Sequence, residues 1–145
     1  MTDPHRYQLK IRPPARTHDI HGSGDYGALR GGDRTHNGID IACYPGSIIH
    51  SIRPGVVTKH GWPYSAADKQ HLRYIEVTDP AGYRLRYFYV QPIAEVNSII
   101  RAGDEIGISQ RLTDVYPGIT EHIHFEVIHN GRHINPEPFL TGMAR

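Results

Sequence analysis

The chain has 145 residues, 38% of them hydrophobic, and a formal net charge of +1 at pH 7, with its lysines and arginines scattered among acidic residues. This balance argues against a nucleic-acid-binding face, and no apolar run approaches the ~20 residues of a membrane span. Cys43 is the only cysteine, which excludes an intrachain disulfide and a cysteine-rich zinc site.

Residues 1–21 are mostly polar, are rich in proline at their start, and lack the apolar stretch that a signal peptide needs. We expect them to form an N-terminal arm and residues 22–145 to form a single folded domain, because a chain of this length can bury one core. The sequence holds no repeat, low-complexity tract or domain linker that would divide it further.

Beyond the arm, short runs rich in Ile, Val, Tyr and Thr alternate with turn residues, and long amphipathic helix patterns are missing. Closely spaced runs of this kind pair as antiparallel strands, so the sequence predicts an all-β fold with little helix. A short helical turn is expected over 93–99, and Asn130-Gly131 should form a hairpin turn because both residues tolerate positive φ. The predicted strands cover residues 38–43, 47–52, 55–60, 73–78, 83–90, 105–109 and 122–128.

Three segments between the strands are predicted to be loops. Residues 22–33 are rich in glycine and contain Tyr26 and Arg30, residues 62–70 contain the only tryptophan, and residues 111–121 lead into a pair of histidines. Loops on a rigid sheet often carry binding residues, although they also carry ordinary solvent-facing polar side chains.

The first candidate chemical motif pairs His36 with Asp40, four residues further on. That spacing puts the imidazole and the carboxylate on one side of either a helix or a strand. Gly38 and the β-branched residues Ile39 and Ile41 favour extended chain. Alone, the spacing also fits a polar pair on the surface.

The second candidate motif is a strictly alternating segment. His122, His124 and Glu126 face one side of the predicted strand, while Ile123 and Phe125 face the other and should pack in the core. The two histidines could be two metal ligands, one ligand beside an acid or base, or part of a solvent-facing stripe. The other eight histidines have no partner at motif spacing, and we expect surface or structural roles for them.

Two histidines and one carboxylate form a ligand set for catalytic zinc, which keeps three protein ligands and one open position. Zinc lowers the pKa of a bound water toward ~7 and polarises a carbonyl group. A general base must then take the proton of that water. If His124 is the ligand, the neighbouring His122 can act as the base.

The order of these motifs resembles the lysostaphin/LytM-type zinc endopeptidases, which hydrolyse peptides of bacterial peptidoglycan. The likeness runs from about residue 24 to residue 140. It implies an antiparallel, all-β fold, distantly like a lipoyl-type hairpin fold, with a groove between loops above a central sheet. The motifs are His36-x-Gly38-x-Asp40, the segment 83–90, Gly103-Asp104-x-x-Gly107, His122-x-His124-Phe125-Glu126-Val127, Asn135-Pro136 and Phe139-Leu140.

Carried over by position, the resemblance implies one zinc ion per chain, held by His36, Asp40 and His124. It implies that His122 is a catalytic histidine, and we hypothesise that His122 is the base for a zinc-bound water, the nucleophile that attacks a cross-link or stem peptide. Glu126 is also expected to accept a hydrogen bond from a ligand histidine.

The sequence departs from the family pattern at one position. The family usually carries a second catalytic histidine in a strand reading Tyr-x-His-Leu, where this chain reads Tyr87-Phe88-Tyr89-Val90. Tyr89 should share a strand face with Tyr87 and point into the groove. A phenol with a pKa near 10 is a poor base at neutral pH. It can donate a hydrogen bond, and we hypothesise that Tyr89 stabilises the oxyanion of the transition state.

Contacts to the substrate peptide are expected from residues in or beside the predicted loops. The candidates are Asn37, Tyr26, Arg30 and Tyr116. We expect a monomer that acts at the bacterial cell wall, in the periplasm or outside the cell, as a phage-encoded lysin, a virion-associated enzyme or an exported enzyme whose leader has been removed.

Three alternatives remain open from the sequence. The first is a catalytically silent module of the same fold that binds the cell wall or regulates a partner. The second is a cupin-type metalloenzyme, although cupins generally add a glutamate and a further histidine that the His36/Asp40 pair does not match. The third is a lipoyl-like carrier, suggested by residues 101–107, although no lysine lies at a convincing hairpin tip.

Overall fold

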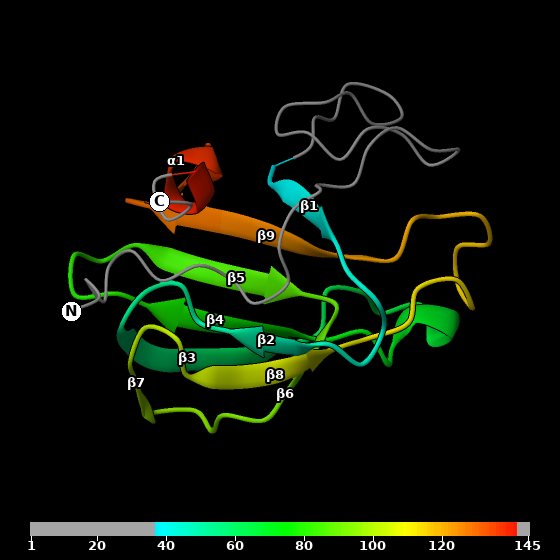
Figure 1. Cartoon of the computed structure of the whole chain (residues 1–145), viewed down its shortest axis with the longest axis horizontal. Coiled ribbons are helices and arrows are strands. Elements are labelled where there is room, and N and C mark those ends of the chain that lie inside the picture. Colours follow the sequence, from blue (N-terminus) through cyan, green and yellow to red (C-terminus); the bar gives the residue numbers. More distant parts are fainter. Residues whose placement is uncertain (1–36, 142–145) are drawn as a thin grey trace.

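The computed structural model describes residues 37–141, which form two antiparallel sheets around one core (Figure 1). The all-β prediction is confirmed, and the helices within this range are a 3₁₀ turn, η2 (Ala67–Lys69), and a short helix, α1 (Glu137–Thr141). The strands are β1 (Ile39–Ala42), β2 (Ile48–His50), β3 (Gly55–Gly61), β4 (Tyr74–Thr78), β5 (Arg84–Phe88), β6 (Val90–Pro92), β7 (Ile99–Ile100), β8 (Glu105–Ser109), β9 (His122–His129) and β10 (Arg132–Ile134).

The larger sheet has the strand order β1-β9-β5-β4-β3-β7, and the smaller sheet has the order β2-β8-β6. Strand β9 pairs with β5 along one edge, and β1 and β10 follow one another along its other edge. The longest strand, β9, thus lies between β5 and the two short strands. Residues far apart in the sequence are brought to its two sides by this pairing.

The core lies between the sheets, and the strands β1, β4, β5 and β9 contribute alternate residues to it. Ile123 and Phe125 on β9 are fully buried against residues of the smaller sheet such as Ile49 and Ile106. Burying one side chain of this size contributes about 1.5–3 kcal/mol to folding. Tyr87 of β5 is also fully buried, and its hydroxyl accepts a hydrogen bond from the Ile52 backbone N–H at 3.2 Å.

The Asn130-Gly131 turn forms as the sequence predicts. Asn130 and Gly131 have φ values of 53° and 75°, and they connect β9 to β10 with Arg132 opposite His129. The segment before β8 is also a tight turn, in which Gly103 has a φ of 93° and the Asp104 N–H donates to the Arg101 carbonyl at 3.0 Å. Residues 101–104 therefore form a β-turn at the start of a core strand.

The predicted helical turn over 93–99 is wrong. Asn97 has a φ of 75°, and its N–H donates to the Val57 carbonyl of β3 at 2.7 Å. This tertiary hydrogen bond holds the segment as a turn, which continues directly into β7. The helix that the sequence analysis missed, α1, begins after Asn135, whose side chain accepts a hydrogen bond from the Glu137 N–H at 3.0 Å.

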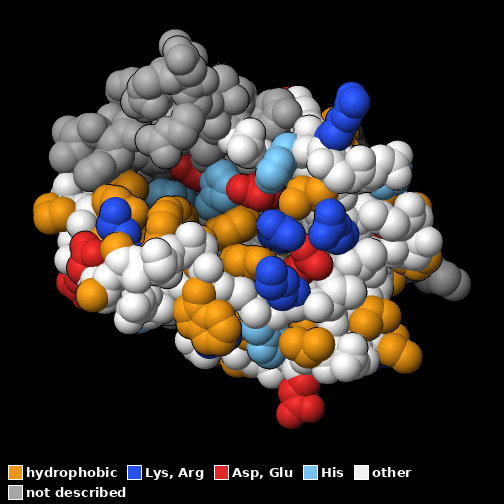
Figure 2. Space-filling view, turned by 180° about the vertical axis from the view of Figure 1, so that it is seen from behind, with side chains coloured by type: hydrophobic (Ala, Val, Ile, Leu, Met, Phe, Trp, Pro, Cys, Tyr) orange, Lys and Arg blue, Asp and Glu red, His pale blue; other side chains and the backbone are white. Residues whose placement is uncertain are grey.

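The outer face of the larger sheet carries polar residues in rows that run across the strands. Asp40 of β1 is opposite His124 of β9, and one row along, Glu126 is opposite Arg86 of β5. Arg86 is opposite Glu76 of β4, and the two form an ion pair at 2.7 Å. Seen from behind, histidine, acidic and basic side chains gather in one band across the molecule (Figure 2). Neither helix within residues 37–141 is long and apolar enough to cross a membrane.

Candidate active site

The site begins with the carboxylate of Asp40, which lies between two histidines. Asp40 and His124 are cross-strand partners, and their Oδ1 and Nδ1 atoms are 2.8 Å apart. His122, two residues earlier on the same face, has its Nε2 atom 3.4 Å from Oδ2 of Asp40. The side chains are 2% exposed for Asp40, 3% for His122 and 12% for His124, so this is a buried polar cluster rather than a solvent-facing stripe.

His122 is oriented by the end of the loop before it. Its Nδ1 atom is hydrogen-bonded to the backbone carbonyl of Thr120. Because a carbonyl can only accept, Nδ1 carries the proton, and Nε2 of the neutral imidazole is left as an acceptor. That lone pair faces Asp40, so His122 would act as a base through Nε2.

His124 is held from its far side by Glu126. The Nε2 atom of His124 donates to Oε2 of Glu126 at 2.8 Å, and Nε2 of His133 donates to the other carboxylate oxygen, also at 2.8 Å. Burial lowers the pKa of His124, but its hydrogen bonds to Asp40 and Glu126 outweigh burial and raise it to about 9. Burial raises the pKa of Glu126, but the hydrogen bonds and charges of His124 and His133 together outweigh burial and lower it, so the carboxyl group stays ionised.

The donor atoms gathered here suit zinc, which takes nitrogen and carboxylate-oxygen ligands. The Nδ1 atom of His124 lies beside Asp40, and a carboxylate holds its other nitrogen, as is usual for ligand histidines in zinc proteins. Within residues 37–141, no three His, Cys, Asp or Glu side chains form a group that could hold a metal ion. The third predicted ligand, His36, lies outside that range, so the described residues fit two of the three ligand positions.

Gly38 gives the His124 ring the space that it occupies. A Cβ atom at this position would lie 2.8 Å from Nε2 of His124 and 2.3 Å from the Phe125 carbonyl oxygen. Contacts this close are not tolerated, so only glycine lets β1 approach β9 here. The glycine of the predicted His-x-Gly-x-Asp motif therefore shapes the site without contributing a functional group.

Tyr89 lies in the site for a different reason from the one that the alternation suggested. Tyr87 points into the core, and β5 ends at Phe88, so Tyr89 does not share a strand face with Tyr87. Tyr89 has a φ of 65°, which turns its side chain toward the outer face. Its ring contacts the His122 ring edge-on, with the centroids 5.6 Å apart.

The backbone of Tyr89 is held in this conformation from both sides. Its N–H donates to the Arg73 carbonyl at 2.7 Å, and its own carbonyl accepts from the Gln110 N–H at 2.8 Å. A left-handed conformation costs a non-glycine residue about 1–3 kcal/mol, and it persists where the surroundings fix it. Burial raises the pKa of the Tyr89 phenol well above 10, and the nearby Tyr64 adds to the shift, so the hydroxyl is protonated at neutral pH.

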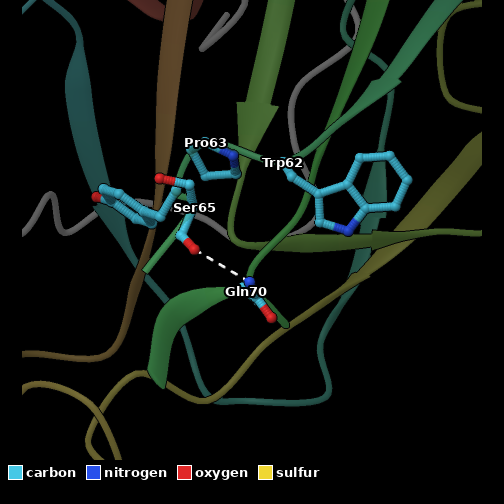
Figure 3. Close-up of a pocket in the computed structure, with 5 residues that line it drawn as sticks. Trp62, Pro63, Ser65 and Gln70 are labelled. Carbon is cyan, nitrogen blue, oxygen red and sulfur yellow. Dashed lines mark hydrogen bonds between the residues drawn. The ribbon is translucent and has the colours of Figure 1, made fainter. Parts of the chain in front are cut away.

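The segment 62–70 forms the wall beside Tyr89. The hydroxyl oxygens of Tyr64 and Tyr89 are 2.9 Å apart. A pocket of about 630 Å³ adjoins this pair, and in its wall the Gln70 amide donates to the Ser65 carbonyl at 3.0 Å (Figure 3). Its lining residues are Trp62, Pro63, Tyr64, Ser65 and Gln70.

The predicted substrate contacts are only partly described. Tyr116 lies in the loop that leads to His122, with the Lys69 ammonium 5.0 Å from the centre of its ring. Asn37 is exposed just before β1. Tyr26 and Arg30, like His36, lie outside the described residues.

Sequence reasoning missed three residues that support the site. The Glu121 carboxylate accepts from the Leu112 N–H at 2.6 Å and the Thr113 hydroxyl at 2.9 Å, which closes the loop before His122. His133 holds Glu126, and Tyr64 holds Tyr89. None of the three has a motif spacing to the residue that it supports, and only the fold brings the pairs together.

Residues 34–136 match the model of peptidase family M23. Leukocyte cell-derived chemotaxin-2 from Bos taurus is 34% identical over 111 residues, covering 77% of this chain and 71% of the relative. The antimicrobial peptidase lysostaphin from Staphylococcus simulans superposes with a TM-score of 0.64 at 21% identity, covering 91% of this chain and 56% of that chain. A catalytic-domain mutant of the prophage-encoded M23 protein EnpA from Enterococcus faecalis superposes with a TM-score of 0.58 at 24% identity. The match covers 88% of this chain and 95% of that chain.

The chain spans little more than half the length of the lysostaphin chain that it matches, and at these identities the solved structures establish a common fold. The family model extends over most of the sequence and includes both candidate motifs. This protein belongs to peptidase family M23.

Proposed function

We propose that this protein is a zinc-dependent endopeptidase that hydrolyses peptide bonds in bacterial peptidoglycan, in the cross-link or the stem peptide. The observation that carries the proposal is the buried cluster in which Asp40 and Glu126 hold opposite nitrogens of His124. Two carboxylates around one buried imidazole suit a metal ligand with a fixed ring orientation. Membership of a peptidase family points to the same reaction.

In this proposal, His36, Asp40 and His124 hold the zinc ion. When bound, zinc lowers the pKa of a water molecule and polarises the scissile carbonyl. The protein contributes a fixed orientation of the His124 ring, because Glu126 holds Nε2–H and directs Nδ1 toward Asp40. Asp40 supplies an oxygen donor directly across from β9.

His122 takes the proton of the attacking water. Its Nδ1–H is held by the Thr120 carbonyl, so Nε2 is the basic nitrogen and faces the site. Tyr89 donates its hydroxyl proton in a hydrogen bond to the developing oxyanion, since burial keeps the phenol protonated. Base and donor thus lie next to each other, with their rings in edge-on contact.

The substrate and setting follow from the relatives. Lysostaphin is described as an antimicrobial peptidase and EnpA as prophage-encoded, which supports a wall peptide as substrate and a lysin or virion-associated enzyme as the setting. The EnpA domain is matched over 95% of its length, which supports one catalytic domain over 22–145 after an arm over 1–21. We propose that this domain acts as a monomer at the cell wall, outside the cytoplasm.

The test is hydrolysis of purified peptidoglycan by protein of known zinc content, beside His122→Ala and a chelated sample. New amino and carboxyl termini that require both zinc and His122 would establish the endopeptidase, and the product masses would name the bond. Far-ultraviolet circular dichroism of His122→Ala checks that the variant is folded. A fully zinc-loaded protein that releases nothing from several wall types would reject the proposal.

The second candidate function is a silent module that binds the wall or a partner. The similarity to chemotaxin-2 favours it, because that relative is named for chemotaxis and not for hydrolysis. Wall binding without turnover in the same assay, measured by sedimentation with peptidoglycan, would select this function over the enzyme.

A further inference from the structure

The residue that contacts the Tyr89 hydroxyl comes from a segment that no motif marks. Tyr64 lies between Trp62 and η2, and its hydroxyl oxygen is 2.9 Å from that of Tyr89. It is half-buried and forms part of the wall of the 630 Å³ pocket. Tyr64 therefore contacts both the open pocket and the phenol that lies against His122.

Tyr64 is itself held by two further side chains. It shares a hydrogen bond with Tyr116, which belongs to the loop leading to His122. The Lys69 ammonium lies over both rings, 5.5 Å from the centre of Tyr64 and 5.0 Å from that of Tyr116. The two loops on either side of the site are thus joined at the Tyr64 hydroxyl.

The protons of these hydroxyl groups limit what the pair can do. A hydroxyl group has one proton to donate and can accept two hydrogen bonds. Burial raises the pKa of Tyr64 to about 12 and that of Tyr89 well above 10, so both phenols keep their protons at neutral pH. Tyr64 is bonded to both Tyr89 and Tyr116 but has one proton, so the Tyr89 proton is left for a third group only when Tyr116 donates to Tyr64 and Tyr64 donates to Tyr89.

We propose that Tyr64 is a positioning residue, which donates its proton to the Tyr89 oxygen and so leaves the Tyr89 proton for the oxyanion of the substrate. This inference rests on the proposed function, because it concerns the same reaction. A hydroxyl that accepts one hydrogen bond donates a stronger one, since bonds in a chain polarise one another. Tyr64 acts through Tyr89 and does not itself contact the reacting atoms.

The position of Tyr89 makes this support necessary. Its φ of 65° places the backbone, but the phenol can still rotate its hydroxyl proton toward either neighbour. Tyr64 is the neighbour within hydrogen-bonding distance of that oxygen, and Tyr116 in turn is bonded to Tyr64. Either hydroxyl can donate in the Tyr64–Tyr89 bond, and the proposed role requires that Tyr116 donates to Tyr64 and Tyr64 donates to Tyr89.

The kinetic test compares Tyr64→Phe, Tyr89→Phe and the double variant. Tyr64→Phe should lower kcat about three- to tenfold, the effect of one net hydrogen bond, and leave KM within about twofold. The double variant should be no slower than Tyr89→Phe alone, because Tyr64 then has nothing to position. Tyr44→Phe is the matched control, since Tyr44 is 87% exposed and its loss should leave kcat unchanged.

A second measurement needs no turnover. The zinc-loaded protein is titrated calorimetrically with a phosphinic analogue of a wall peptide, whose tetrahedral oxygens imitate the oxyanion. Tyr64→Phe should weaken binding about three- to tenfold in the presence of Tyr89 and have no effect in Tyr89→Phe. Unchanged kcat and unchanged phosphinate affinity in Tyr64→Phe would overturn the role of Tyr64, as would additive losses in the double variant.

The two assays separate this inference from the proposed function. In one outcome the wild type shows no turnover, but Tyr64→Phe weakens phosphinate binding only when Tyr89 is present. That outcome would reject the endopeptidase and keep the role of Tyr64. An active wild type that is insensitive to Tyr64→Phe would keep the endopeptidase and reject the role of Tyr64. Failure of both turnover and phosphinate binding would overturn both.

Discussion

Glu126 and His124 lie two positions apart on the same face of β9, and the imidazole Nε2 donates to the carboxylate Oε2 at 2.8 Å. The bond leaves Nδ1 of His124 as the atom that faces Asp40. His133, at the far side of the Asn130-Gly131 hairpin, fixes the other oxygen of Glu126. A strand, a hairpin and a neighbouring strand thus together orient one ring nitrogen.

The first prediction is that Glu126→Gln weakens zinc binding about 10- to 100-fold, because an amide is a weaker acceptor and no longer favours the required tautomer. Competition with a chromophoric chelator measures the affinity. Glu105→Gln on β8 is the matched control, since Glu105 is exposed and outside the site. Equal affinities of the two variants would show that Glu126 does not orient the ligand.

The second prediction concerns Gly38→Ala. The new Cβ would lie 2.3 Å from the Phe125 carbonyl oxygen and 2.8 Å from the His124 ring, so β1 or the ring must move. We expect a loss of about 1–3 kcal/mol in the free energy of unfolding together with weaker zinc binding. Urea unfolding and chelator competition measure the two effects.

The control for this prediction is Gly46→Ala. Gly46 has a φ of 86°, and no neighbouring atom lies within 4 Å of the place that an alanine methyl would take, so alanine there strains only the backbone. It should lose about 1 kcal/mol of stability and keep its zinc affinity. If Gly38→Ala also kept its affinity, the glycine would not be shaping the site.

The alternation on β9 could be predicted from the sequence, because the two-residue period of a strand is a local property. The Asn130-Gly131 turn could also be predicted, because the preference of asparagine and glycine for positive φ is a local property, and both residues have positive φ in the structure. The contact between Asp40 and His124 spans 84 positions, and their spacing to nearby residues does not reveal it. The family resemblance, and not residue periodicity, paired these two motifs.

Tyr89 shows what local reasoning could not predict. Alternation puts it on the face of Tyr87, which is the core face, whereas its left-handed backbone puts it in the site. That conformation depends on the Arg73 carbonyl and the Gln110 N–H, which belong to other segments. Tyr64 was missed for a related reason, because its contact with Tyr89 joins positions 25 residues apart that no strand pairing relates.

The third prediction is a pH dependence of the metal-free protein. His124 has its pKa raised from 6.5 to about 9 in the folded state, so protonation stabilises the fold. The contribution is fully present below pH 6.5 and is lost as the pH rises through about 9, a loss on the order of 1–3 kcal/mol. Glu126, whose pKa is lowered, stays ionised throughout this window.

Urea unfolding of chelated protein at several pH values between 6 and 10 measures this loss. His124→Gln should flatten the curve over that window, because glutamine has no proton to release. A curve for the wild type that is already flat would contradict the ion pairs that Asp40 and Glu126 form with His124.

The last prediction compares three residues at position 89. Tyr89→Phe removes the proposed oxyanion donor and should lower kcat about 10²-fold with little change in KM, the usual effect of losing one such donor. Tyr89→His introduces the histidine that the sequence resemblance implies at this position, and histidine is among the side chains that more often adopt positive φ. It should therefore keep the backbone in place and be more active than Tyr89→Phe. Steady-state kinetics on a defined wall peptide, with zinc content measured for each variant, tests whether kcat is higher with tyrosine or histidine at position 89 than with phenylalanine. Equal rates for the wild type and Tyr89→Phe would remove Tyr89 from the reaction, and His122 would then act without a neighbouring phenolic donor.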